Sequence, residues 1–167
     1  MKTYTVHLIR HAMTKENTEG KYIGQTDVEP TKEGLAQIKN LMDENEGYPY
    51  ADVVISSPLK RCTETAKLIY PEKEPVIMQD LIEYDFGDFE GMTADELKDR
   101  DTFKDWISGA HPEEPVPFGE SQKEFNDRIC KCFIRIIEGI IKSGTRSTAI
   151  ITHGGIIMSL MAAFAIP

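Results

Sequence analysis

Near its start the chain reads Thr5-Val6-His7-Leu8-Ile9-Arg10-His11, a largely apolar run that ends on an arginine and a histidine. Near its end it reads Ser147-Thr148-Ala149-Ile150-Ile151-Thr152-His153, a second apolar run that ends on a histidine. Arg61 and Glu83 also follow short apolar runs. If these runs are parallel strands of one sheet, all these polar side chains lie along its carboxyl edge, where open α/β sheets bind their ligands.

The rest of the chain alternates strand-like runs with helical patterns. Strands are expected at residues 4–9, 53–55, 76–78 and 147–152. Helices are expected to start at a Thr31 cap, at Ser57-Pro58, at capping boxes that begin with Thr93 and Ser121, and near Gly155. This alternation predicts an α/β fold with three layers, in which a mostly parallel central sheet carries helices on both faces. No repeat or linker divides residues 1–167, so we expect a single domain.

The composition is that of an acidic globular protein. With 28 acidic and 19 basic residues the net charge is −9, and no basic stripe offsets it. Such acidity argues against a nucleic acid or an anionic membrane as partner. The longest apolar stretch, residues 156–166, is far shorter than a membrane span. Because the first strand follows Met1-Lys2-Thr3 with no signal peptide, we expect a cytoplasmic protein.

The three cysteines, Cys62, Cys130 and Cys132, indicate neither a disulfide framework nor a zinc site. Their number is odd, and the Cys-Lys-Cys spacing has no second ligand pair in the sequence. The sequence also lacks GxxxxGK[ST] and GxGxxG motifs. No cysteine is followed six positions later by an arginine, which argues against a cysteine phosphatase. We therefore expect metal-independent chemistry with no cofactor.

Arginines, histidines and one carboxylate are the groups that phosphoryl transfer requires. It needs an in-line nucleophile, cations around the phosphoryl oxygens and an acid for the leaving oxygen. A neutral imidazole, with an ordinary pKa of about 6.5, can attack phosphorus. Either His11 or His153 could do so, with the other as a cationic ligand of the oxygens. Arg10 and Arg61 supply planar donors that match phosphate geometry, and Glu83 is the candidate acid.

Each of these residues alone has a simpler explanation. A lone histidine beside a strand is more often structural than catalytic. Arg61 could lie on a helix surface and pair with Glu64, and Glu83 is one of 28 acidic residues. The functional interpretation depends on all four following successive strand ends, which scattered surface residues would rarely do.

Five segments resemble the motifs of the histidine phosphatase superfamily, which includes the cofactor-dependent phosphoglycerate mutases. They are residues 8–17, 56–66, 81–91, 119–121 and 152–155. The resemblance implies a phosphoglycerate mutase-like fold, with His11 as the phosphorylated nucleophile and Glu83 as the acid and then the base. It implies a phosphate pocket formed by Arg10, Arg61 and His153. The expected substrate-binding residues are Asn17, Ile23, Gly24 and Gly154.

Within this superfamily the length of one segment favours a small phosphatase. The mutases carry a long insert between the acid and the Gly-Glu-Ser segment, whereas Glu83 and Gly119 are close in this sequence. The chain therefore resembles the α-ribazole phosphatases, and a small phosphorylated metabolite is the expected substrate. One alternative is a mutase-like phosphotransferase. Another is a non-catalytic module that binds a phosphorylated ligand, for which the only indication is Ala12, where the family has a glycine. An added Cβ there could crowd the pocket or require a permitted φ.

The last expected helix is apolar nearly all round its circumference. It occupies residues 156–166, and the strand that follows it in the family is absent from this sequence. A helix of this kind needs cover on several sides. We therefore expect a catalytic domain that is incomplete at its C-terminus or is covered by another chain, as in a homo-oligomer.

Overall fold

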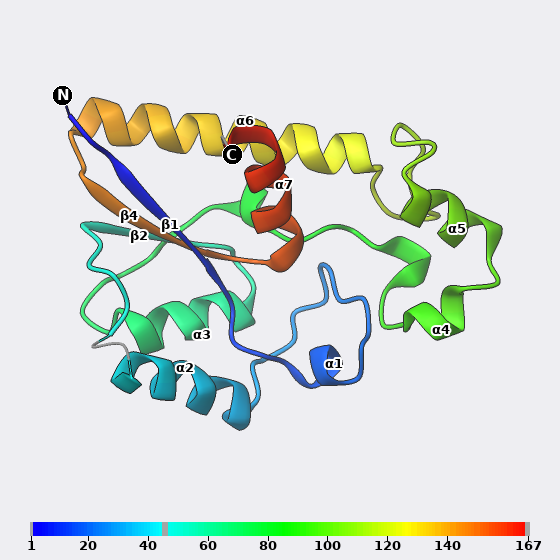
Figure 1. The fold of residues 1–167 in the computed structure, drawn as a ribbon, viewed down its shortest axis with the longest axis horizontal. Helices are drawn as coiled ribbons and strands as arrows, with labels where there is room; N and C mark the ends of the chain where they lie inside the picture. The colour runs from blue at the N-terminus through cyan, green and yellow to red at the C-terminus, as the bar shows by residue number, and fades with distance from the viewer. Residues whose placement is uncertain (1, 45–46, 166–167) are drawn as a thin grey trace.

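A parallel sheet of four strands forms the centre of the computed structural model, which describes residues 2–44 and 47–165 (Figure 1). The strands are β1 (Thr5–Arg10), β2 (Val53–Ser56), β3 (Val76–Ile77) and β4 (Ser147–Thr152). Their order across the sheet is β1-β4-β2-β3, and each neighbouring pair is parallel. The register pairs Arg10 with Thr152, so β1 and β4 end side by side.

Helices cover both faces of this sheet. Helices α2 (Lys32–Glu44) and α3 (Lys60–Ile69) lie on one face, and α6 (Gln122–Ser143) and α7 (Gly154–Phe164) lie on the other (Figure 1). Successive side chains of a strand point to opposite faces. In β4, Ala149 and Ile151 pack in the core cluster of α2 and α3, whereas Ile150 packs in the cluster of α6 and α7. The predicted three-layer α/β/α architecture is confirmed.

Shorter elements lie beyond the carboxyl ends of the strands (Figure 1). They are α1 (Lys15–Thr18), α4 (Ala94–Leu97), α5 (Asp101–Ser108) and two 3₁₀ turns, η1 (Gln79–Leu81) and η2 (Gly87–Phe89). The capping boxes predicted at Thr93 and Ser121 are confirmed, since each hydroxyl accepts a hydrogen bond from the backbone N–H three residues later. Gly144 ends α6 in the left-handed conformation, with φ of 74°.

One predicted cap is wrong. Ser57 and Pro58 have the pattern of a helix start, but α3 begins at Lys60, and its N-cap residue is Leu59. The Ser57 hydroxyl instead lies 2.7 Å from the ring nitrogen Nε2 of His153. The Ser57 hydroxyl therefore contacts His153, at the end of β4, instead of capping α3.

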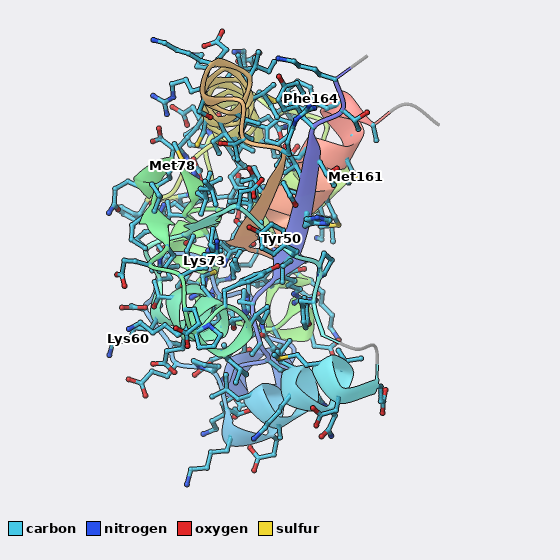
Figure 2. All side chains as sticks on the ribbon, turned by 90° about the vertical axis from the view of Figure 1, so that its left-hand side faces the viewer. Tyr50, Lys60, Lys73, Met78, Met161 and Phe164 are labelled. Atoms are coloured by element: carbon cyan, nitrogen blue, oxygen red, sulfur yellow. The ribbon has the colours of Figure 1, made fainter. Side chains whose placement is uncertain are left out.

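Helix α7 is apolar on most of its circumference, as predicted, and is covered on one side only. Ile156 and Leu160 are buried against the sheet and α6, whereas Met158, Met161 and Phe164 are 70%, 54% and 43% exposed. Figure 2 shows Met161 on the outer side of the helix, whereas the Phe164 ring packs against Phe133 of α6 with ring centroids 5.1 Å apart. Within residues 2–44 and 47–165, no helix is both long and apolar enough to cross a membrane.

Candidate active site

The predicted site residues meet at the carboxyl edge of the sheet. Arg10 is the last residue of β1, and His11 follows it, while His153 directly follows β4. Because the two strands are neighbours, the rings of His11 and His153 lie with their centroids 5.3 Å apart. Arg61 lies in the first turn of α3, and its Nε atom is 3.3 Å from Nδ1 of His153. The prediction that these side chains lie together at the carboxyl edge of the sheet is confirmed.

His11 is held as a neutral imidazole. Its Nδ1 atom lies 2.7 Å from the carbonyl oxygen of Ala12, and because a carbonyl only accepts, Nδ1 carries the proton. Burial lowers the pKa of His11 to about 4, and the charges of Arg61 and Arg10 act in the same direction, while the bond to Ala12 opposes them. At neutral pH the other ring nitrogen, Nε2, therefore retains its lone pair.

His153 differs from its predicted state. It was expected as a cationic ligand of phosphoryl oxygens, but burial and the charge of Arg61 lower its pKa well below the ordinary value. Its Nδ1 accepts a hydrogen bond from Arg61 Nε, so Nε2 carries the proton and donates to Ser57. The ring is completely buried, and its nitrogens contact protein atoms. In this structure His153 is thus a neutral residue behind His11.

Arg61 is fixed by backbone carbonyl groups. One terminal nitrogen donates to the carbonyl oxygen of Gly24 at 2.6 Å and the other to that of Thr26 at 2.9 Å. Arg61 is 1% exposed, so the alternative of a surface residue that pairs with Glu64 is wrong. The loop that holds it is held in turn by Glu90, whose carboxylate accepts hydrogen bonds from the N–H groups of Gly24 and Thr26. Both backbone polar groups of Gly24 are therefore engaged with protein atoms.

Glu83 is a buried carboxyl group at the N-terminus of α7. Its Oε1 accepts a hydrogen bond from the Tyr84 N–H at 2.9 Å, and its Oε2 accepts one from the Gly155 N–H at 3.1 Å. Gly155 permits this approach, because a Cβ on it would lie 2.6 Å from Oε1. Burial raises the pKa of Glu83, although the two N–H groups and the charges of Arg61 and Arg128 oppose the shift. A raised pKa is what a proton donor near neutral pH requires.

A cavity of about 420 Å³ opens in front of these groups. Of the predicted site residues, its lining includes Arg10, His11, Asn17, Ile23, Glu83 and Gly154. Arg61, His153 and Gly24 lie behind this lining and do not form part of it. Arg10 is exposed, and no residue of the described chain accepts a hydrogen bond from its guanidinium. The Asn17 side chain also has a structural task, since its oxygen accepts a hydrogen bond from the Thr14 N–H and so caps α1.

Ala12 fits its position without strain. It is 2% exposed, it packs in the core cluster of α2 and α3, and its N–H donates to Thr65 Oγ1 at 2.8 Å. Of the non-glycine residues in the described ranges, only Phe118 has a positive φ. Ala12 therefore has a φ that is permitted to a residue with a Cβ. It lines a cavity of about 550 Å³ beside Arg10, His11 and Asn17, and it does not line the cavity in front of Glu83.

Sequence reasoning missed Arg128 on α6. Its guanidinium donates to the carbonyl oxygens of Asp80 and Ile82, at 2.9 and 2.8 Å, and to the carboxylate of Glu120 at 2.6 Å. It thereby ties the segment that carries Glu83 to α6. One arginine on a long amphipathic helix has no distinctive pattern, so no sequence signal identified it.

The part of the chain that the structure describes contains no group of three or more His, Cys, Asp or Glu side chains placed to hold a metal ion. The cavity lining includes Arg10, and Arg61 lies behind it; guanidinium groups bind phosphate through paired N–H donors. A neutral imidazole, a carboxyl group with a raised pKa and two guanidinium groups can together carry out phosphoryl transfer.

Comparison with known proteins gives the same assignment. The sequence profile of the Histidine phosphatase superfamily (branch 1) matches residues 6–166. An acid phosphatase of Mycobacterium tuberculosis is 31% identical over 156 residues, which span 92% of this chain and 72% of the relative. A 2,3-bisphosphoglycerate-dependent phosphoglycerate mutase of Rhizobium etli is 27% identical over 166 residues, which span 93% of this chain and 78% of the relative.

A solved structure supports the fold. The crystal structure of an alpha-ribazole phosphatase from Shigella flexneri superposes with a TM-score of 0.78 at 25% identity, and the match covers 97% of this chain and 80% of that one. The parallel sheet with helices on both faces is thus the phosphoglycerate mutase-like fold that the resemblance implied. The protein is an enzyme that belongs to the histidine phosphatase superfamily.

Proposed function

We propose that the protein hydrolyses the phosphate monoester of a small metabolite through a phosphohistidine intermediate on His11. The observation that best supports this function is the state of the His11 ring. Its Nδ1 proton is directed to Ala12, and burial holds its pKa at about 4. No residue in the described ranges forms a hydrogen bond with Nε2, so its lone pair is available in the cavity.

In the first half of the reaction, His11 Nε2 attacks phosphorus. The N–P bond forms as the P–O bond to the alcohol breaks, and Glu83 gives its proton to the leaving oxygen. Arg10 lies in the cavity lining, and Arg61 supplies a second positive charge from behind His11. Both charges stabilise the phosphoryl oxygens as negative charge develops on them. His153 holds the Arg61 guanidinium through its Nε–H.

In the second half, Glu83 acts as a base. Its carboxylate takes a proton from water, and the water oxygen attacks phosphorus as the N–P bond breaks. Inorganic phosphate leaves, His11 returns to its neutral form and Glu83 again carries a proton. Glu83 is thus the general acid in the first half of the reaction and the general base in the second.

The test is to trap the intermediate. After alkaline quenching of the working enzyme, we expect a base-stable, acid-labile phosphate on the peptide that contains His11, detected by mass spectrometry at alkaline pH. His11→Ala should abolish it, whereas His111→Ala, a change at an exposed histidine that does not line the cavity, should leave it intact. His153→Ala should leave weak residual activity, because it disturbs Arg61 rather than the bond-forming atom. Near-normal turnover by His11→Ala would refute the assignment.

A mutase-like phosphotransferase is the second candidate, and the similarity to the Rhizobium etli mutase supports it. With 3-phosphoglycerate we expect little isomerisation and no requirement for a bisphosphate primer. Efficient, primer-dependent formation of 2-phosphoglycerate would favour the mutase over the hydrolase.

A further inference from the structure

A second cavity, of about 370 Å³, continues from the first on the far side of Glu83. The two cavities share five lining residues, which are Tyr22, Glu83, Phe86, Gly155 and Met158. If phosphate lies beside His11, the ester oxygen lies toward Glu83, and the carbon skeleton of the alcohol extends into this second cavity. This step rests on the proposed function.

Five of the eleven residues that line the second cavity are aromatic. Phe86 packs against Tyr22 and Tyr84, with ring centroids 5.3 and 5.0 Å apart, and Trp106 lies 5.8 Å from Phe86. These contacts are tilted or edge-to-face, which is a favourable arrangement of aromatic pairs. Tyr22, Phe86 and Trp106 remain partly exposed, so the wall presents apolar ring surface that a bound molecule would cover.

The second cavity has no positive charge in its lining. Apart from the Glu83 carboxyl group and two tyrosines, its lining residues carry no ionisable group. The first cavity contains two cations: Arg10, which the proposed mechanism assigns to the phosphoryl oxygens, and Lys21, whose ammonium group pairs with Glu19 at 2.7 Å. A carboxylate on the alcohol would therefore lie against aromatic rings and beside the acid without a partner, which is costly for a charge removed from water.

The polar groups at the rim are neutral. Asn126 on α6 and Ser159 on α7 lie at the mouth of the second cavity, and the Ser159 hydroxyl donates to the Asn126 side-chain oxygen at 2.5 Å. The Tyr84 hydroxyl inside is already engaged with the Glu120 carbonyl oxygen and the Trp106 indole. Neutral donors and acceptors at the rim of an apolar pocket are typical of a site for an uncharged, mostly apolar molecule.

We propose that the second cavity is the leaving-group site and that it selects phosphate esters of uncharged alcohols that carry an aromatic ring. Esters of carboxylated alcohols are disfavoured. Met158, 70% exposed and part of both linings, is the residue at which a change of charge should alter this preference.

The test compares three alkyl esters: 2-phenylethyl phosphate, ethyl phosphate and 3-phosphoglycerate. We expect kcat/KM for the phenylethyl ester to exceed that for the ethyl ester by about tenfold or more, because burial of a ring is worth at least that factor. Among the three, 3-phosphoglycerate should be the poorest substrate. Met158→Lys should raise kcat/KM for 3-phosphoglycerate by about tenfold relative to the phenylethyl ester, since it supplies the missing cation.

Met161→Lys is the matched control. Met161 lies on the same helix, is 54% exposed and lines neither cavity, so this variant should keep the wild-type ranking. Phosphohistidine formation with equal rates for the phenylethyl and ethyl esters would overturn the proposal while leaving the proposed function intact. A wild-type preference for 3-phosphoglycerate would overturn it as well. Absence of turnover and of phosphohistidine with every ester would refute the proposed function and this inference together.

Discussion

Replacement of Glu83 by glutamine removes the acidic proton but keeps the shape of the side chain, so it tests the catalytic role of Glu83 apart from its structural role. The two carboxyl oxygens each accept one backbone N–H, from Tyr84 and Gly155. A glutamine retains one oxygen, and its amide group must face the other N–H, so one buried donor loses its acceptor. We expect a loss in the free energy of unfolding of about 1–3 kcal/mol, which leaves a folded protein.

The effect of Glu83→Gln on catalysis should depend on the leaving group. General acid catalysis typically contributes about 10²–10⁴-fold, or roughly 3–5 kcal/mol of activation free energy. An alkyl phosphate, whose alkoxide is a poor leaving group, should lose this full factor in the step that phosphorylates His11. A nitrophenyl phosphate needs little protonation and should lose much less.

The assay is rapid-quench measurement of phosphohistidine formation with both esters, because steady-state rates also contain the dephosphorylation step. Glu120→Gln is the control, since Glu120 lies in the same network but lines neither cavity. It should slow both esters by the same factor. If Glu83→Gln also slows the phosphorylation step equally for both esters, Glu83 is not the acid, and Asp85 and Asp88 become the next candidates.

Three further predictions follow from the structure. The folded-state pKa of His11 is about 4, so the unfolded state binds more protons than the folded state between pH 6.5 and 4. The free energy of unfolding should therefore fall by about 3 kcal/mol as the pH is lowered from 6.5 to 4. In chemical denaturation at several pH values, His11→Asn should remove this part of the pH dependence. Arg128→Met removes a positive charge that lowers the pKa of Glu83, so the alkaline limb of the pH profile for phosphorylation of His11 should move to higher pH. Arg128→Lys keeps the charge and should move this limb less. An unshifted limb in both variants would show that Arg128 does not affect the pKa of Glu83. The exposed apolar side of α7 predicts self-association that rises with concentration in sedimentation, and Phe164→Glu should weaken it; a wild-type monomer at all concentrations would rule this out.

Much of the fold follows from local patterns. Apolar runs marked the strands, capping boxes marked the starts of α4 and α6, and Gly144 marked the end of α6. The site followed from topology, since residues after parallel strands must share one edge of the sheet. The positions of His11 and His153 just after two predicted parallel strands were enough to predict that the two histidines lie at the same edge of the sheet.

What the sequence could not provide depends on long-range contacts. The pattern at Ser57 indicated a helix cap, but the hydroxyl faces His153, which is 96 residues away along the chain. The neutral state of His153 comes from burial and from Arg61, and neither is visible in a local motif. The Glu90 carboxylate accepts hydrogen bonds from backbone N–H groups of a distant loop. Because nearly every residue has a backbone N–H, the loop sequence does not reveal this contact.

The buried guanidinium of Arg61 implies a trade-off between activity and thermal stability. Folding removes this cation from water and surrounds it with two carbonyl oxygens and an imidazole rather than a carboxylate. A buried charge of this kind often lowers stability relative to a well-packed apolar side chain. Arg61→Met would remove the buried charge, but it would leave the two carbonyl oxygens and His153 Nδ1 without a donor. Selection for heat resistance could therefore replace Arg61 only together with the loop that surrounds it, and selection for turnover would keep both.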